Sequence, residues 1–163
     1  MQPPVLPRTD ASIYGLHPGY RDPFTLWING PPGSGKSTLA YWFRFKLPKT
    51  VLISGGLYGE LAAKAKVANE TGQLAIVDCD SQDLEQHQAA REILGQRRFH
   101  RIHMTTPLRI CKIRYRKGNY PSMAFLPNPQ GVSIMTVDTT QMPTMYSADR
   151  IIHGFKKRLL QTL

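Results

Sequence analysis

The sequence is poor in cysteine and contains no long apolar run. Its two cysteines, Cys79 and Cys111, have no metal-binding spacing, so we expect both thiols to be reduced and buried rather than bridged. No apolar segment approaches the roughly 20 residues of a membrane-spanning helix. Residues 1–8 also lack the charged-then-apolar order of a secretion signal. These absences argue against a disulfide scaffold, a zinc domain and a membrane protein. We expect one cytoplasmic domain, because 163 residues fit a single core.

Acidic residues are also scarce, but only in the second half of the chain. Residues 1–90 carry eight Lys/Arg and eight Asp/Glu, whereas residues 91–163 carry thirteen Lys/Arg and three Asp/Glu, and these supply the whole net charge of +10. Such asymmetry indicates an anionic partner. ATP together with a small anionic substrate would fit, and nucleic acid is the less favoured alternative. The remaining interpretation is a basic surface that contacts only solvent.

A phosphate-binding motif of the P-loop (Walker A) type, G-x-x-x-x-G-K-[ST], occupies residues 30–37. An apolar strand is expected before it at residues 25–29 and a helix after it at residues 38–47, which is the context that the motif requires. Its glycines let backbone N–H groups point at phosphate oxygens. Lys36 would reach the β- and γ-phosphates, and the Ser37 hydroxyl would bind Mg²⁺. The alternative is a chance Gly-rich turn. The expected ATP-binding residues are Gly30, Pro31, Pro32, Gly33, Ser34, Gly35, Lys36, Ser37 and Thr38.

The rest of the chain alternates strands and helices, which predicts a parallel sheet covered on both faces. Residues 1–23 contain five prolines and are expected to form an irregular arm before a domain at residues 24–163. Further strands are expected at residues 50–54, 74–78, 99–104 and 132–137. Helices are expected at residues 57–70, 82–94 and 107–116. A last amphipathic helix from about Thr144 should turn these residues inward: Ile151, Ile152, Phe155, Leu159 and Leu160.

Two carboxylates follow the strand at residues 74–78, at the edge where ligands bind in open α/β sheets. Asp78 is expected to help hold Mg²⁺, and Asp80 to orient an acceptor hydroxyl or to act as a base. The alternative is that one of them only caps the following helix. His100 and His103 fall on opposite faces of their strand, so core or surface roles are expected for both.

Five basic side chains lie on the helix at residues 107–116 and just beyond it: Arg109, Lys112, Arg114, Arg116 and Lys117. A closing lid at about residues 112–131 could bring one or two of them onto the phosphates. The alternative is a solvated helix face.

Several stretches resemble the adenylyl-sulfate kinase family of P-loop kinases, which use ATP to phosphorylate the 3′-hydroxyl of adenylyl sulfate. The resemblance rests on residues 24–38, on residues 89–95 and on the segment from Thr106 through Tyr120. It implies that Arg114 contacts the nucleotide. It also implies a three-layer P-loop NTPase fold with five parallel strands in the order 2-3-1-4-5 and a lid.

The sequence departs from this family at the expected acceptor site. The family carries Asp-Gly-Asp after its second strand, where this chain has Ser54-Gly55-Gly56. The family also has an arginine-containing loop after its third strand, where residues 80–85 contain no arginine. Both losses concern groups that hold Mg²⁺ or the acceptor in the family.

The sequence therefore predicts an ATP- and Mg²⁺-dependent kinase with Lys36, Asp78, Asp80 and Arg114 as catalytic residues, and Ser37 and Asp78 at the metal. It would transfer phosphate to a hydroxyl of a small anionic acceptor, with adenylyl sulfate as the first candidate. A kinase of another nucleotide, sugar or nucleic acid and a nucleotide-binding module without turnover are the alternatives. The chain could also form a homodimer.

Overall fold

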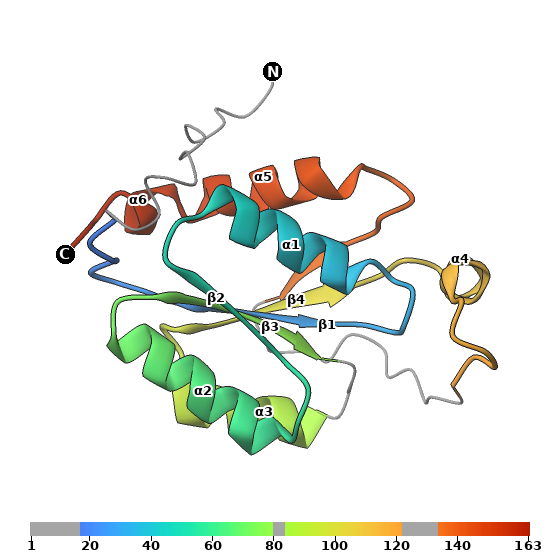
Figure 1. The fold of residues 1–163 in the computed structure, drawn as a ribbon, viewed down its shortest axis with the longest axis horizontal. Coiled ribbons are helices and arrows are strands. Elements are labelled where there is room, and N and C mark those ends of the chain that lie inside the picture. The colour runs from blue at the N-terminus through green and yellow to red at the C-terminus, as the bar shows by residue number, and fades with distance from the viewer. Residues whose placement is uncertain (1–16, 80–83, 122–133) are drawn as a thin grey trace.

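The computed structural model describes residues 17–79, 84–121 and 134–163 (Figure 1). Five features predicted from the sequence fall partly or wholly outside these ranges. They are residues 1–16 of the arm, Asp80, residues 82–83 of a predicted helix, residues 122–131 of the lid, and residues 132–133 of the last predicted strand.

Five parallel strands form one sheet in the order β2-β3-β1-β4-β5, which confirms the predicted order. β1 lies at the centre and is buried along its whole length, as expected of an apolar strand with a neighbour on each side. Its last residue, Asn29, leads directly into the phosphate loop. The strands are β1 (Thr25–Asn29), β2 (Thr50–Ser54), β3 (Leu74–Cys79), β4 (Phe99–Met104) and β5 (Ile134–Val137).

Helices cover both faces of this sheet (Figure 1). α1 and α5 pack together on one face, and α2 and α3 pack together on the other. α4 lies beyond the carboxyl ends of the strands, next to the phosphate loop. The helices are α1 (Lys36–Lys46), α2 (Tyr58–Glu70), α3 (Leu84–Leu94), α4 (Leu108–Arg114), α5 (Thr144–Gly154) and α6 (Lys156–Leu159).

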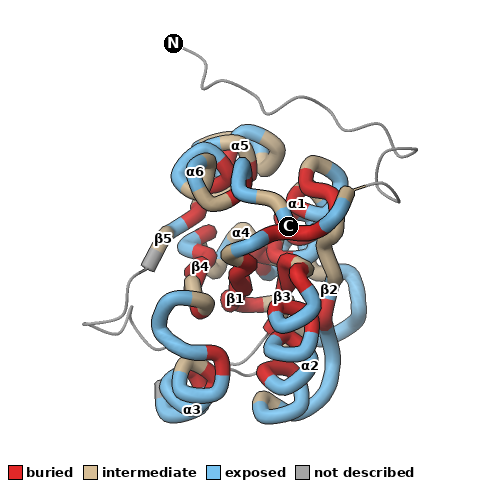
Figure 2. Tube along the Cα trace, turned by 90° about the vertical axis from the view of Figure 1, so that its left-hand side faces the viewer, coloured by how far each residue is buried: buried red, intermediate tan, exposed pale blue. Residues whose placement is uncertain are grey.

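Two hydrophobic cores result from the alternation of side chains along the strands. On β1, Leu26 and Ile28 enter the core beneath α1 and α5, whereas Trp27 enters the core against α2 and α3. Figure 2 shows the buried strands between helices whose outer surfaces are exposed. His100 and His103 lie on opposite faces of β4, as predicted, with His100 against the ring of Phe155 and His103 beside Asn29.

The last helix differs from its prediction. The chain forms α5 and then the short α6, and Phe155 lies between them with φ −102° and ψ 8°. This break changes the direction of the following side chains. Leu159 stays buried, as expected, but Leu160 is 64% exposed, so its predicted inward position is wrong. None of the helices in the described ranges combines the length and apolar character that crossing a bilayer requires.

Candidate active site

The phosphate loop connects β1 to α1 at the carboxyl edge of the sheet. Gly33 and Gly35 have φ values of 81° and 100°, in the left-handed region that favours glycine. α1 begins at Lys36, immediately after Gly35. The first N–H groups of an eleven-residue helix therefore face the loop, where the helix dipole favours an anion.

Lys36, Ser37 and Asp78 meet at this helix terminus. The Lys36 ammonium donates a hydrogen bond to the carbonyl oxygen of Pro31 across 3.1 Å, so its charge lies over the loop. The Ser37 hydroxyl donates to Asp78 Oδ2 across 2.9 Å. Asp78 stands on β3 directly beside Ile28 of β1, which brings its carboxylate next to the start of α1. The structure thus joins three residues that the sequence analysis selected.

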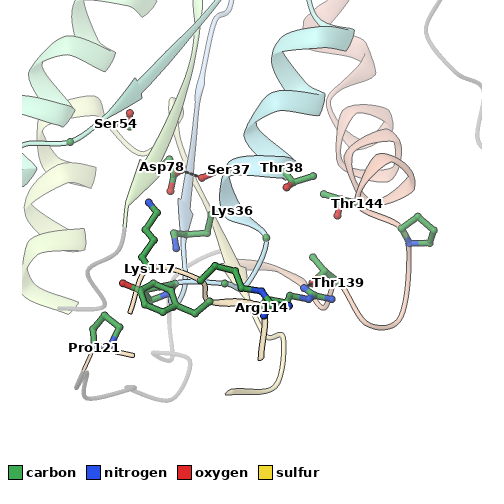
Figure 3. Close-up of a pocket in the computed structure, with 17 residues that line it drawn as sticks. Lys36, Ser37, Thr38, Ser54, Asp78, Arg114, Lys117, Pro121, Thr139 and Thr144 are labelled. Atoms are coloured by element: carbon green, nitrogen blue, oxygen red, sulfur yellow. Dashed lines mark hydrogen bonds between the residues drawn. The ribbon is translucent and has the colours of Figure 1, made fainter. Parts of the chain in front are cut away.

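These residues open into a cavity of about 840 Å³ (Figure 3). The phosphate loop and the start of α1 form one wall, and the segment after α4 forms another. Thr139 and Thr144 come from the chain after β5. The described residues that line it are Pro32, Gly33, Gly35, Lys36, Ser37, Thr38, Ser54, Gly55, Asp78, Arg114, Tyr115, Arg116, Lys117, Pro121, Thr139, Pro143 and Thr144.

The loop is held from behind by residues that the sequence analysis did not select. The Thr106 hydroxyl donates to the carbonyl oxygen of Ser34 across 3.0 Å, and the backbone N–H of Thr139 donates to Thr106 Oγ1 across 3.1 Å. Tyr120 OH donates to the carbonyl oxygen of Pro32 across 2.8 Å. Three separate segments therefore fix the shape of the phosphate loop.

The basic residues near α4 divide into two groups. Arg114, Arg116 and Lys117 line the cavity, whereas Arg109 and Lys112 do not. Arg114 Nη1 donates to Thr139 Oγ1 across 2.6 Å, which holds the guanidinium at the cavity wall opposite Asp78 (Figure 3). The Lys112 ammonium lies 5.9 Å from the centre of the Tyr120 ring. Arg109 is exposed on α4 and does not line the cavity, which favours the alternative of a solvated helix face for this residue.

Known proteins resemble this chain in sequence and in structure. No family model matches the chain. An adenylyl-sulfate kinase of Escherichia coli (strain E24377A) is 34% identical over 128 residues, which cover 64% of this chain and 63% of that protein. The chain thus spans less than two thirds of the length of this relative. The sequence similarity confirms the resemblance inferred above.

Two solved structures share the fold. The Mycobacterium tuberculosis APS kinase CysC, solved with AMPPNP and APS, superposes with a TM-score of 0.67 and 19% identity, covering 85% of this chain and 99% of that one. The hexameric APS kinase from Thiobacillus denitrificans gives 0.62 and 16%, covering 88% of this chain and 31% of that one. This chain has an adenylyl-sulfate-kinase-like sequence and the fold of a P-loop kinase.

The adenylyl-sulfate-kinase-like chain carries no acid at the end of β2. Ser54 and Gly55 occupy the cavity wall there, so this strand offers a hydroxyl where the resemblance implied a carboxylate. Among the residues described, Asp78 is the carboxylate that lines the cavity. Asp80 lies outside the described residues, and its role stays a prediction.

The donor set suits Mg²⁺ bound together with phosphates. Mg²⁺ prefers oxygen ligands, keeps several waters and is commonly held by one or two protein groups plus substrate phosphates. Ser37 and Asp78 provide a hydroxyl and a carboxylate at the start of α1. Within the described ranges, no cluster of three or more His, Cys, Asp or Glu side chains could hold a metal alone. An ion at this site would therefore depend on bound nucleotide.

Proposed function

We propose that this protein is an ATP-dependent kinase that moves the γ-phosphate of ATP to a hydroxyl of a small anionic, nucleotide-like acceptor. Adenylyl sulfate is the first candidate acceptor. The observation that carries the proposal is the hydrogen bond between Ser37 and Asp78, next to Lys36 and inside one cavity. Phosphoryl transfer depends mainly on positioning and on charge neutralisation, and these groups supply both at one place.

Each residue has a role in this proposal. The loop N–H groups and Lys36 bind the β- and γ-phosphates, and Ser37 with Asp78 holds Mg²⁺, which supplies positive charge at the phosphates when bound. Arg114 contributes a cation from the opposite wall, and Lys117 lies close enough to the same cavity to do so as well. Asp80 remains our candidate for the residue that orients the acceptor hydroxyl.

The test is ADP release by the whole chain with Mg²⁺ and ATP, with and without adenylyl sulfate. We expect the acceptor to stimulate release, and Lys36→Ala to abolish the stimulated rate because the β- and γ-phosphates lose their cation. Lys64→Ala is the matched control, since Lys64 is exposed on α2, away from the cavity. Stimulation that survives in Lys36→Ala would contradict the proposed mechanism.

A second candidate function follows from the end of β2, where no carboxylate is present. With Ser54 and Gly55 at that wall, the protein could prefer another acceptor, or bind ATP without turnover. ATP binding without stimulation by adenylyl sulfate would favour this candidate, and a panel of nucleotides, sugars and nucleic acids would follow. Binding to nucleic acid should then weaken steeply with added salt.

A further inference from the structure

β2 lies at one end of the sheet and pairs with β3 along one of its two edges. Figure 2 shows β2 and β5 at opposite ends of the row of strands. The outer edge of such a strand presents backbone N–H and C=O groups that can pair with another chain. Proteins usually protect this edge with charged side chains, proline or a bulge. Residues 50–59 contain no charge and no proline, and the register with β3 is unbroken.

Exposed apolar side chains lie beside this edge, on the face of the sheet that α1 covers. Leu52 is 38% exposed and is directly beside Ile76, which belongs to the core beneath α1. On α1, which contacts β2, Tyr41 is 57% exposed and Phe45 is 45% exposed. Their rings stack with centres 6.1 Å apart. We call β2 with Tyr41, Phe45 and Leu52 the β2 edge surface, and its apolar character is typical of contact with another protein.

A second copy of this chain fits the β2 edge surface, because antiparallel pairing of two identical strands is self-complementary. A two-fold axis at Leu52 places Thr50 of each copy opposite Ser54 of the other. The two Leu52 side chains then meet at the axis, and the α1 helices of both copies cover the same face of one joined sheet. The edge groups of each β2 gain hydrogen-bond partners in the other copy.

The charges near the two ends of β2 fit the same arrangement. A net charge of +10 makes most contacts between two copies repulsive, so a stable contact needs uncharged or opposite charges. Pairing centred on Leu52 places Lys49 of one copy opposite Gly55 of the other. A Cβ at the next residue, Gly56, would lie 2.9 Å from Glu60 Oε2, so the Glu60 carboxylate is beside this position. Lys49 of each copy therefore approaches Glu60 of the other, and symmetry forms this contact twice.

We propose that two copies of this chain form a dimer by antiparallel pairing of their β2 strands, with Leu52 at the two-fold axis. The pairing covers the β2 edge surface, and the attraction between Lys49 and Glu60 favours the antiparallel direction. Gly55 lines the active-site cavity, so the interface ends at the cavity wall. The proposal stands apart from the kinase function, because its tests need neither ATP nor an acceptor.

The first test is sedimentation velocity of the whole chain between about 1 and 100 μM, where a contact of this size should dissociate. We expect a dimer. Leu52→Lys should raise its Kd at least about tenfold, because two like charges would meet at the axis. Val67→Lys is the matched control, since Val67 is 60% exposed on α2, outside the β2 edge surface. An unchanged Kd in Leu52→Lys would overturn the proposal. A monomeric native chain would also overturn it and would leave the edge to another protein or to residues 1–16.

The second test uses Leu52→Cys, which replaces the exposed leucine without adding a charge. Directly opposed residues of antiparallel strands have Cα atoms about 4.5–5.5 Å apart, within the reach of a disulfide. The native cysteines, Cys79 and Cys111, are both buried. Diamide, which takes up the two electrons, should therefore link Leu52→Cys chains in pairs and leave Val67→Cys chains mostly unlinked. Equal linking in the two variants, or no linking of Leu52→Cys, would overturn the proposed axis.

Charge reversal tests the direction of pairing. Lys49→Glu and Glu60→Lys should each raise the Kd by about 3- to 10-fold, because like charges then meet twice. The double variant exchanges the two charges and should restore the native Kd. Lys64→Glu is the control, since it alters the net charge as Lys49→Glu does but lies on exposed α2. Failure of the double variant to recover would overturn the antiparallel pairing, and so would an equal effect of Lys64→Glu.

Discussion

The Ser37 hydroxyl donates to Asp78 Oδ2 across 2.9 Å, joining the first turn of α1 to the end of β3. The two residues are 41 positions apart in the sequence and meet because β3 lies beside β1. The guanidinium of Arg114 lies on another wall of the same cavity, so the cavity separates it from the Asp78 carboxylate (Figure 3).

Asp78→Asn should lower the rate of ADP release and raise the Mg²⁺ concentration needed for half-maximal rate, by roughly 10- to 100-fold. An amide can still accept from Ser37, so the fold should be kept, but the negative charge that would favour Mg²⁺ is gone. Mg²⁺ titrations of the stimulated rate measure the effect. Glu70→Gln, on exposed α2, is the control and should change neither quantity. An unchanged Mg²⁺ requirement in Asp78→Asn would remove Asp78 from the metal site.

Gly33→Ala should destabilise the protein by more than Gly118→Ala does. Both glycines have positive φ, 81° and 97°, so both variants carry the left-handed backbone penalty of about 1 kcal/mol. A Cβ at Gly33 would in addition collide with the carbonyl oxygen of Cys111, whereas Gly118 has open space. Urea unfolding should show a further loss of roughly 1–3 kcal/mol for Gly33→Ala. Equal losses in the two variants would show that the loop can move away from α4.

Thr139→Val should weaken ATP binding and lower the free energy of unfolding by about 1 kcal/mol. The variant keeps the shape of the side chain but removes the oxygen that accepts from Arg114 Nη1 at 2.6 Å. Calorimetric titration with ATP and Mg²⁺ measures the affinity. Thr140→Val is the control, because the Thr140 hydroxyl bonds to Asp138 and does not line the cavity. Native ATP affinity in Thr139→Val would mean that Arg114 needs no support from the chain after β5.

Stability should fall below about pH 6.5 in part through His103. Burial and the nearby Arg101 lower the pKa of His103 from its ordinary value of 6.5. The unfolded chain therefore binds this proton at a higher pH than the folded chain. The contribution is complete above pH 6.5 and is lost as the pH falls toward the lowered pKa, with a slope of up to about 1.4 kcal/mol per pH unit.

The variant His103→Gln tests the predicted direction of this pH dependence. Glutamine can accept from Asn29 but does not titrate, so the free energy of unfolding should depend less steeply on pH between about 6.5 and 5. Urea unfolding across this range measures the slope. His153→Gln, exposed on α5, is the control. His17 and His100 also have lowered pKa values, so some pH dependence should remain in every variant. The slope of His103→Gln is therefore compared with the slope of His153→Gln. A slope unchanged in His103→Gln would show that His103 is protonated equally in both states.

The sequence correctly predicted those features of the fold that depend on one strand and the strands beside it. The phosphate loop is local, and the proximity of Asp78 to Ser37 follows from the shared carboxyl edge of parallel strands. The same rule could have found Thr106 and Thr139, since each lies two residues beyond the end of its strand. They were missed because an uncharged hydroxyl gives no signal until its partner is known.

Arg101 and Leu160 were harder to place for a different reason. An arginine on an alternating strand is normally exposed, and only the packing of α2 and α3 against that face buries it. The direction of Leu160 depends on the break between α5 and α6, which follows Gly154, whereas the apolar spacing continues across this break to Leu160. For Arg101 the deciding contacts are with helices remote in the sequence, and periodicity carries no information about them.

During synthesis on the ribosome, the residues that hold the phosphate loop in shape emerge long after the loop itself. Tyr120, Thr106 and Thr139 are 88, 72 and 105 positions from their partners in the loop. A nascent chain that has emerged only to residue 100 carries the whole phosphate-binding motif without any of these contacts. Long-range contacts form late because closing a long loop costs entropy. The ability to hold a nucleotide should therefore appear only after Thr139 has emerged from the ribosome.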